Sequence, residues 1–343
     1  MKRFIIIFSL LALVSVPAFS QVDFQDFEDA FSGFSGEVAQ SLPYASTIGL
    51  TWSDATVRGF PHFGAGISAG AVTIPQKAFN DVATQLGDGF PSDMDFSDWG
   101  LPFPGYTIEG RVGLPILPFD VGAKFGTITP TMAKSIEKST DVATNYTMGG
   151  FEVRMPIIKQ KLLIPSISLA AGYTFLTGGV STSIDGLPTE FSADTGNDTL
   201  NTELQKLSFE NPKLRFEWET SVIDFKVQAS ENLLIFTPYA GMGYSYGISS
   251  AGGGLETQLL YNDEEITQEQ IDDIKGAFEA ADKEAPELDK EKGITVKEPT
   301  KGGTMRAFGG LSVNLLILKL DLTAQYSFLT KSFGATLGAR IQI

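Results

Sequence analysis

His62, in the stretch GFPHFGAG, is the only histidine of the chain. A histidine beside a serine or an aspartate can serve as the general base of a hydrolase. A single histidine that follows Pro61 at the start of a strand is more typical of a turn or interface residue. The sequence also contains no H-E-x-x-H motif. We therefore expect no enzymatic activity.

Four aspartates, Asp88, Asp93, Asp95 and Asp98, lie close together around the stretch SDMDFSD. Carboxylate oxygens at such spacing can ligate Ca²⁺. The stretch lacks the full EF-hand pattern, and acidic residues are also common in solvated loops. We therefore prefer a solvated loop and expect neither a metal site nor a cofactor. Whether the four aspartates bind Ca²⁺ is left open.

Charged side chains occupy one face of several stretches in which apolar and polar residues alternate. In 105–115, for example, Tyr106 and Ile108 share one face while Glu109 and Arg111 share the other. A period of two is typical of a β-strand. In a narrow barrel with its polar faces inward, both signs of charge would share one lumen and pair with each other. The candidate lumen-lining residues are Glu109, Arg111, Asp120, Lys124, Glu152, Arg154, Arg215, Glu217, Asp224, Lys226, Lys319, Asp321 and Arg340.

The stretch 213–228 contains a change of register. Leu214, Phe216 and Trp218 alternate with charged residues, and then Ile223, Phe225 and Val227 continue the apolar series at odd positions. We interpret the step at 220–222 as a β-bulge. This interpretation puts Phe216 and Trp218 on the same face as Phe225, with Arg215 and Glu217 on the polar face.

The first twenty residues have the pattern of a cleaved signal peptide. Lys2 and Arg3 precede an apolar run from Phe4 to Val14, and Ala18 and Ser20 fit a cleavage site after Ser20. Removing this segment takes away two cations and changes the net charge from −16 to −18. So acidic a protein is a poor candidate for nucleic acid or for an anionic membrane surface, because both attract basic patches.

The lengths of the connections separate a soluble β-sandwich from a membrane barrel, which alternation alone does not. Short links near 116–117, 158–160 and 230–232 take turns with long ones near 74–104, 129–144, 177–207 and 250–303. Outer-membrane barrels have tight periplasmic turns and long extracellular loops. We therefore expect an all-β fold, an antiparallel up-and-down transmembrane barrel, whose last strand, 331–343, pairs with an early one.

Together these features resemble the bacterial outer-membrane β-barrels. The terminal Ile343 departs from the aromatic last residue that is common in that class. The segment SLPYASTIGLTWSDATVRGFPHFGAGISAG, 41–70, also resembles the start of FadL-like barrels of the spirochaete type. The resemblance implies a short helical N-terminal hatch and a lateral route for hydrophobic ligands.

We predict three parts: a signal peptide over 1–20, a helical hatch over 21–58, and a barrel over 59–343 with a long acidic extracellular loop at 250–303. The strand count is about 10–14, with 44–53 outside the wall or further strands within 177–207 and 250–261. Val22, Phe24, Phe27, Phe31 and Phe34 are spaced as in a helix. Ile271, Ile274 and Phe278 predict an amphipathic helix inside the long loop.

The expected function is passage of small, preferably hydrophobic, molecules across the outer membrane. A lumen of this size with an N-terminal plug leaves little room for an open aqueous pore. The alternatives are a structural or adhesive surface barrel and a general diffusion porin. The expected partners are the lipid bilayer, the barrel-assembly machinery and a hydrophobic ligand, and no nucleic acid.

Overall fold

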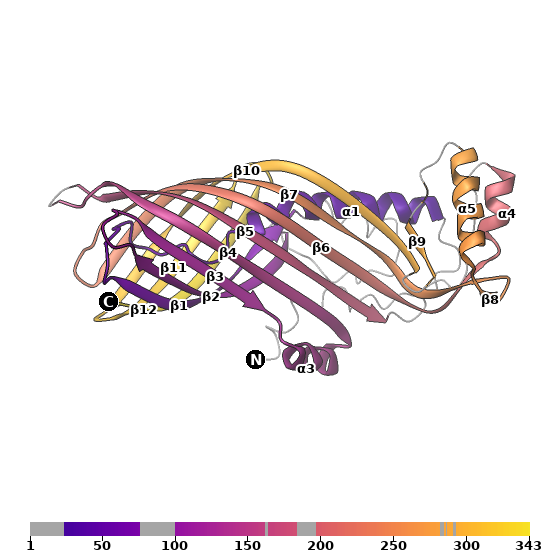
Figure 1. Cartoon of the computed structure of the whole chain (residues 1–343), viewed down its shortest axis with the longest axis horizontal. Coiled ribbons are helices and arrows are strands. Elements are labelled where there is room, and N and C mark those ends of the chain that lie inside the picture. Colours follow the sequence, from indigo (N-terminus) through magenta and orange to yellow (C-terminus); the bar gives the residue numbers. More distant parts are fainter. Residues whose placement is uncertain are drawn as a thin grey trace.

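A computed structural model describes residues 24–75, 100–161, 164–183, 197–281, 285, 287–290 and 293–343. Ten long antiparallel strands form a closed barrel, in which each strand pairs with the next along the chain and the last pairs with the first (Figure 1). They are β1 (Phe63–Ile74), β2 (Leu101–Gly113), β3 (Asp120–Thr127), β4 (Val142–Ile158), β5 (Ser166–Ser183), β6 (Leu207–Ser230), β7 (Phe236–Tyr261), β10 (Gly293–Leu315), β11 (Leu318–Ser327) and β12 (Ser332–Gln342).

Closure is made by the last strand. β12 pairs with β1 from Gly64↔Gln342 to Val72↔Gly334, and on its other side with β11. Both edges of the sheet are thereby removed, which is how barrels avoid exposing unpaired backbone groups. The predicted all-β barrel is confirmed, with a strand count at the lower end of the expected range.

The two ends of the barrel differ in their connections. At one end, 114–119, 159–165, 231–235 and 316–317 join neighbouring strands; we call this the short-turn end. The long connections on the other side of the wall carry α3 (Pro130–Thr140), which lies near the middle of the long axis, and α4 (Asp198–Leu204), α5 (Gln268–Ala280) and the short strands β8 (Glu264–Glu265) and β9 (Glu287–Asp289), which lie toward the opposite end (Figure 1). The link 328–331 is the one short connection there among the described strands.

Several strands continue well beyond the predicted bounds. β7 runs to Tyr261 and β10 starts at Gly293, so part of the predicted loop 250–303 is sheet. Among the described residues of the stretches 177–207 and 250–261, those in strands lengthen β5, β6 and β7 and form no further strand of the wall. The predicted loop helix is confirmed as α5, which buries Ile271, Ile274 and Phe278 and contacts α4. The aspartate cluster at 88–98 and the signal segment 1–20 lie outside the described residues.

The N-terminal segment fills the interior. The helix α1 (Phe24–Ala45) packs against the inner faces of β6, β7 and β10. The Phe34 ring lies 5.0 Å from the ring of Phe216, and the Phe31 ring lies 6.0 Å from it. From its C-terminal end the chain continues through 46–62 to the short-turn end and enters β1. Residues 44–53 thus lie inside the barrel and are not part of its wall.

β6 corrects the prediction of a bulge at 220–222. Its pairing with β5 and β7 runs without a shift from Lys213 to Ser230. Phe216 and Trp218 are buried on the inner face, while Arg215 and Glu217 lie on the outer face and are partly or fully exposed. β6 is therefore one regular strand, and its inner face changes from apolar to polar because the two parts of that face contact different neighbours.

The length of β6 explains this change. Because the strand is tilted, its 24 residues rise roughly 60 Å along the barrel axis, whereas the apolar band of a membrane barrel is about 25 Å tall. Within the band the outer side chains, such as Ile223 and Phe225, are apolar and exposed. Beyond it the outer side chains face water and are charged, while the inner ones pack against α1.

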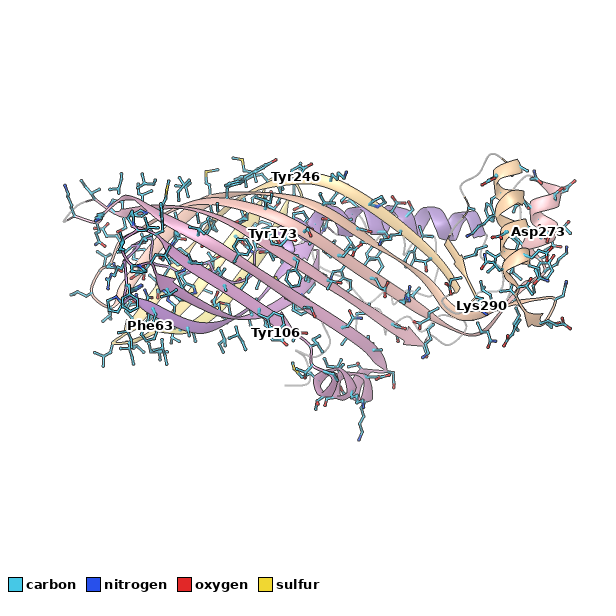
Figure 2. All side chains as sticks on the ribbon, viewed as in Figure 1. Phe63, Tyr106, Tyr173, Tyr246, Asp273 and Lys290 are labelled. Atoms are coloured by element: carbon cyan, nitrogen blue, oxygen red, sulfur yellow. The ribbon has the colours of Figure 1, made fainter. Side chains whose placement is uncertain are left out.

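The outward-facing surface has an apolar band bounded by aromatic side chains. Tyr106, Tyr173 and Tyr246 lie at a similar level along the long axis, and Phe63 lies near the short-turn end (Figure 2). Large apolar side chains between these levels are exposed, among them Ile108, Phe151, Leu322 and Leu337. Aromatic girdles at both interfaces are typical of membrane barrels. None of the described helices is long and apolar enough to span a membrane.

Cysteine scanning of β6 tests this placement, because the chain has no cysteine of its own. We expect Glu217→Cys and Glu219→Cys to react with a membrane-impermeant thiol reagent in reconstituted protein. Phe225→Cys should react only with a lipid-phase probe, and Phe216→Cys with neither reagent until the protein is unfolded. Equal labelling at 216 and 217 by the water-soluble reagent would contradict the continuous register.

Candidate functional site

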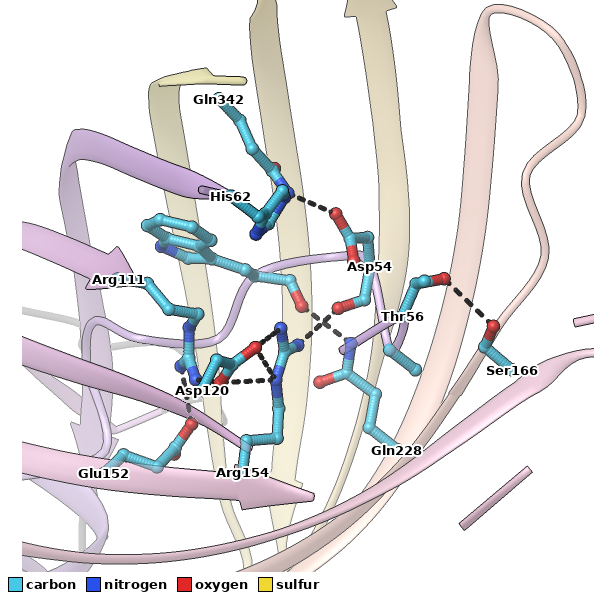
Figure 3. A network of polar contacts seen from close by, with 12 residues as sticks. Asp54, Thr56, His62, Arg111, Asp120, Glu152, Arg154, Ser166, Gln228 and Gln342 are labelled. Atoms are coloured by element: carbon cyan, nitrogen blue, oxygen red, sulfur yellow. Dashed lines mark hydrogen bonds and ion pairs between the residues drawn. The ribbon is translucent and has the colours of Figure 1, made fainter. Parts of the chain in front are cut away.

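A network of buried charges crosses the interior at the short-turn end (Figure 3). Arg111 on β2 lies with Nη1 2.6 Å from Asp120 Oδ1 and with Nη2 2.6 Å from Glu152 Oε1. Arg154 on β4 reaches the other oxygen of Asp120 at 2.7 Å. Lys226 on β6 lies 2.6 Å from Glu152 Oε2. Each charge is therefore paired, as buried charges must be to offset their desolvation.

The network continues around the wall. Arg306 on β10 pairs with Asp224 on β6 at 2.6 Å, and Arg340 on β12 pairs with Asp321 on β11. Eleven of the thirteen predicted lumen-lining residues lie on the inner face here, and we call them, with Arg306, the charged floor. They are Glu109, Arg111, Asp120, Lys124, Glu152, Arg154, Asp224, Lys226, Lys319, Asp321 and Arg340.

Arg215 and Glu217 are not in the charged floor, which corrects the prediction for both. They lie on the outer face of β6 beyond the apolar band, with 3.5 Å between Arg215 Nη2 and Glu217 Oε2. Arg306 is a floor residue that the sequence reasoning missed, although its alternation with the outward Met305 was a usable signal. Asp54 and Trp52 were also missed, because no period-2 pattern extends into the plug segment.

The plug segment 46–62 is held by hydrogen bonds from the floor to its main chain. Lys124 Nζ donates to the carbonyl oxygens of Ser46 at 2.6 Å and Ile48 at 2.8 Å. Lys226 Nζ donates to Leu50 O at 2.8 Å, and the amide of Gln228 donates to Trp52 O at 2.6 Å. An irregular segment at membrane depth needs such partners, because no lipid can satisfy its backbone.

Two side chains of the plug complete the charge pairing. The Trp52 ring lies between two guanidinium groups, with Arg340 Cζ 4.9 Å and Arg111 Cζ 5.4 Å from the ring centroid. Asp54 Oδ2 accepts hydrogen bonds from Gln342 at 2.7 Å and from Lys319 at 3.1 Å. Such cation–π contacts are most favourable where water is excluded. The plug and the floor therefore form one interlocked body.

The pKa of Asp54 reflects this environment. Burial would raise the pKa of this carboxyl, but Lys319, Arg154, Arg340 and the Gln342 hydrogen bond outweigh burial and hold it well below its usual range. A pKa that is lower in the folded than in the unfolded chain adds stability at pH values above about 4. That contribution decreases as the pH falls below the unfolded-state pKa, and it is lost once the pH has fallen through the lower, folded-state pKa.

His62 lies buried at the short-turn end, where its Nε2 is 2.9 Å from the side-chain nitrogen of Gln342. Burial is the main cause that lowers its pKa, so the ring is neutral at pH 7. No described serine hydroxyl is hydrogen-bonded to the ring. This geometry offers no nucleophile for the histidine to activate.

Two stretches match G-x-S-x-G, at 66–70 and 243–247. In a serine hydrolase the motif forms a sharp turn between a strand and a helix. Here both stretches lie within regular barrel strands, β1 and β7. Ser68 donates to Glu109, and Ser245 donates to Asp224 at 2.6 Å. Both serines therefore donate to carboxylates of the charged floor, and the motif follows from glycine-rich alternation.

The floor and the plug are closely packed, and Leu50, Trp52 and Asp54 are buried between the walls. The cavity beside Leu50 and Thr51, lined also by Lys124 and Lys226, measures only about 20 Å³. That is room for about one water molecule. A solute that reaches this level has to displace the plug before it can continue toward the short-turn end.

The interior beyond the floor is apolar. Met148, Leu176 and Val72 point inward from the wall and form one cluster with Val38 and Leu42 of α1. Phe103 on β2 and Trp218 on β6 meet across this space with their ring centroids 5.2 Å apart. The barrel thus has a polar, closed half near the short turns and an apolar half near the long loops.

The wall has a gap where β3 ends. β2 pairs with β3 only from Ile108 to Gly113, and β3 ends at Thr127, with Ile128 N still donating to Tyr146 O of β4 at 2.9 Å. Gly126 of β3 still lies beside Tyr106 and Thr107. Beyond it, residues 101–105 of β2 have no partner strand on that side among the described residues. We call the space between this part of β2 and the start of β4 the wall gap.

Two tyrosines close the wall gap. Tyr106 from the outer face of β2 and Tyr146 from the inner face of β4 stack with an interplanar angle of 25° and 6.0 Å between centroids. Tyr106 Oη donates to Thr127 O, and the buried Tyr146 Oη has no hydrogen-bond partner among the described residues. A Cβ at Gly105 would lie 3.0 Å from Tyr146 Oη, so glycine makes room for this ring.

An apolar groove lies against the wall gap on the outer surface. Its volume is about 430 Å³, and small side chains of β1, β2 and β12 form much of it. Tyr106, Tyr146 and Ile128 line it on the side of the gap. Its remaining lining is Ala69, Gly70, Ala71, Pro104, Gly105, Ala335, Thr336 and Leu337. The stacked tyrosines therefore separate the apolar interior from an apolar outer groove.

No group of histidine, cysteine, aspartate or glutamate side chains suited to hold a metal ion occurs within the described ranges. The acidic stretch that carries Asp88, Asp93, Asp95 and Asp98 is outside these ranges, so the interpretation as a solvated loop stays a prediction and Ca²⁺ binding stays open.

Comparisons with known proteins return outer-membrane barrels at low similarity. No family model and no curated protein sequence matches the chain. The outer membrane protease OmpT from Escherichia coli is 11% identical with a TM-score of 0.40, and the alignment covers 82% of this chain and 97% of OmpT. A Pseudomonas aeruginosa FadL homologue is 13% identical with a TM-score of 0.36, covering 87% and 68%. The translocator domain of the autotransporter NalP from Neisseria meningitidis is 8% identical with a TM-score of 0.34, covering 93% and 100%. Likeness this distant assigns no activity, substrate or partner.

Proposed function

We propose that the protein takes small hydrophobic molecules from outside the cell and releases them sideways, through the wall gap, into the outer membrane. The observation that carries this proposal is the Tyr106–Tyr146 stack, which stands between an apolar interior and an apolar outer groove of about 430 Å³. That volume is within the range of small-molecule sites, about 300–1,000 Å³.

The charged floor supports a lateral exit. A hydrophobic solute gains about 0.8 kcal/mol for each CH₂ group that leaves water. It would lose this gain among the ion pairs of Asp120, Glu152 and Arg154, and passage along the axis would also require breaking them. The path of lowest free energy for such a solute leads from the apolar interior through the wall and into lipid.

The tyrosine stack is suited to act as a gate. Tyr106 contributes one hydroxyl hydrogen bond, to the carbonyl oxygen of Thr127, and the ring of Tyr146 contributes apolar contacts. Rotation of the rings would break the Tyr106 Oη–Thr127 O hydrogen bond but none of the β2–β3 ladder pairs, which run only from Ile108 to Gly113. A bound solute would replace the ring contacts that are lost.

This proposal includes the orientation and the location of the protein. The barrel would lie in the outer membrane after cleavage of residues 1–20, with the short-turn end toward the periplasm, and the barrel-assembly machinery would insert it. The outward apolar band and its aromatic boundaries support this arrangement. His62 would have no catalytic role.

The entry of the hydrophobic dye 1-N-phenylnaphthylamine into cells with an intact outer membrane tests the gate. We expect Tyr146→Ala to speed dye entry severalfold over the unsubstituted protein, because the ring that fills the wall gap is removed. The matched control is Tyr173→Ala, an outward tyrosine of the same girdle on β5, which should leave dye entry unchanged.

Planar-bilayer conductance separates this proposal from a diffusion porin. Tyr146→Ala should not raise the conductance, because the charged floor still closes the axis. Faster dye entry together with higher conductance would favour the porin. Unchanged dye entry in a correctly assembled variant would refute the lateral route.

A surface or adhesive role is the second candidate, and one observation favours it. The end opposite the short turns carries two packed helices, in which Leu200 and Leu204 of α4 are buried with Ile274 and Phe278 of α5. Thr267 and Gln270 form a capping box at the start of α5. Such a cap presents a fixed surface, and deletion of residues 263–292 would abolish adhesion while leaving dye entry intact.

A further inference from the structure

The short-turn end is unusual in the side chains at its turn tips. Ile116, Leu234 and Leu316 have relative exposures of 102%, 98% and 99%, so almost nothing in the chain covers them. Their neighbours Leu117, Ile235 and Ile317 are at least half exposed. At the fourth turn Ile158 and Ile164 are exposed. A turn that stands in water normally carries polar residues, glycine or proline.

The backbone conformation at these three tips is one that large apolar residues rarely adopt. Ile116, Leu234 and Leu316 have φ values of 74°, 52° and 57°, in the left-handed region that glycine and asparagine adopt most readily. At the opposite end of the barrel the same kind of position is held by Asp141, Asn262, Asp263 and Lys331. The left-handed positions of the two ends therefore differ in chemistry, being apolar at the short turns and polar at the opposite end.

The apolar tips continue the lipid-facing surface. From the tip of the β10–β11 turn, the exposed series Leu318, Leu320 and Leu322 leads directly into the outward band. From the β6–β7 tip, Phe236 and Met242 do the same along β7. Phe60 and Ile343 add exposed apolar side chains at the same end. On β11 the alternate outward residues Leu318, Leu320 and Leu322 are all apolar, so the apolar surface reaches the turn there without a break.

The charges at this end are of one sign where they are exposed. Arg58, Lys159 and Lys161 are exposed, and the acidic Glu231 is partly buried. Exposed cations beside an apolar surface suit the phosphate groups of phospholipids. Two copies of this end would bring like charges together, which disfavours end-to-end pairing of the chain.

We propose that the short-turn end is embedded in the phospholipid leaflet and does not stand free in the periplasm. The tips Ile116, Leu234 and Leu316 lie among acyl chains, and Arg58, Lys159 and Lys161 reach the phosphate groups. Long cationic side chains can reach the interface from such a depth. This proposal depends on the barrel spanning a membrane and is independent of the wall gap.

Site-directed fluorescence quenching tests the proposal. Ile116→Cys, Leu234→Cys and Leu316→Cys are labelled with bimane, and the folded proteins are reconstituted into vesicles of phosphatidylethanolamine and phosphatidylglycerol. At all three sites we expect strong quenching by lipids brominated on the acyl chains and weak quenching by iodide. The matched control is Lys331→Cys, a left-handed turn position at the opposite end, where iodide should quench and brominated lipid should not.

Each outcome decides the proposal. Quenching of the three tips by iodide, with none by brominated lipid, would overturn it and leave the tips in water. Protection from both quenchers that appears only at a high protein-to-lipid ratio would also overturn it, in favour of contact between copies. Heat-modifiable migration on gels verifies that each labelled variant is folded, and three independent sites guard against the failure of one.

Discussion

Asp120→Asn is expected to destabilise the folded protein by about 3–5 kcal/mol, the usual cost of removing one partner from a buried ion pair. Asp120 is fully buried and is shared by two cations, Arg111 and Arg154. Its neutralisation leaves Arg111 paired with Glu152, whereas Arg154 keeps the main-chain oxygen of Asp54 and no carboxylate of full charge. The loss of free energy of unfolding would be measured by reversible urea unfolding from vesicles, followed by tryptophan fluorescence.

The matched control is an exposed ion pair on the outer face. Glu219 and Lys297 lie 3.0 Å apart, with side-chain exposures of 61% and 49%. Glu219→Gln should cost no more than about 1 kcal/mol, because water screens such pairs. A cost of the same size for both variants would mean that water reaches the charged floor freely, and the closed axis would have to be given up.

Leu320→Arg is the second substitution with a large expected effect. Leu320 faces outward from β11, in the apolar band between the short turns and the aromatic boundary. An arginine on the lipid face costs roughly 2–4 kcal/mol near the bilayer midplane and much less near the interfaces. We expect a loss of that size in vesicle unfolding, together with a lower yield of assembled barrel.

Glu217→Arg serves as its control, since Glu217 faces outward from β6 beyond the band. The two substitutions introduce the same side chain on the same face of the wall at different heights. A large cost at Leu320 with a small cost at Glu217 gives the position of the lipid. Similar costs at both positions would mean that the outward band does not contact hydrocarbon.

The sequence alone was sufficient to predict the class of fold. Strict alternation assigns side chains to two faces, because successive residues of a strand point to opposite sides. The stretch from Ser332 to Gln342 shows this most clearly, and it closes the barrel as expected. The spacing of Ile271, Ile274 and Phe278 likewise predicted α5, since a buried helical face depends on local periodicity.

Only the tertiary structure decided what each face contacts at each height. In β6 the inner face is apolar beside α1 and polar beside the plug, and the outer face changes in the opposite sense. A sequence pattern records polarity and not position, so Arg215 and Glu217 were assigned to the wrong side. Arg306 joined the floor for a related reason: its role depends on Asp224, which is 82 residues away in the sequence.

The sequence predicted an N-terminal plug, but the contacts that hold it and the wall gap were beyond sequence reasoning for a physical reason. Residues 46–62 have no periodic pattern, and their place is decided by main-chain hydrogen bonds to Lys124, Lys226 and Gln228. The Tyr106–Tyr146 stack joins two strands across the end of a third, and such a contact follows from the register of the whole sheet. Local sequence determines which residues share a face, whereas distant neighbours determine which faces meet.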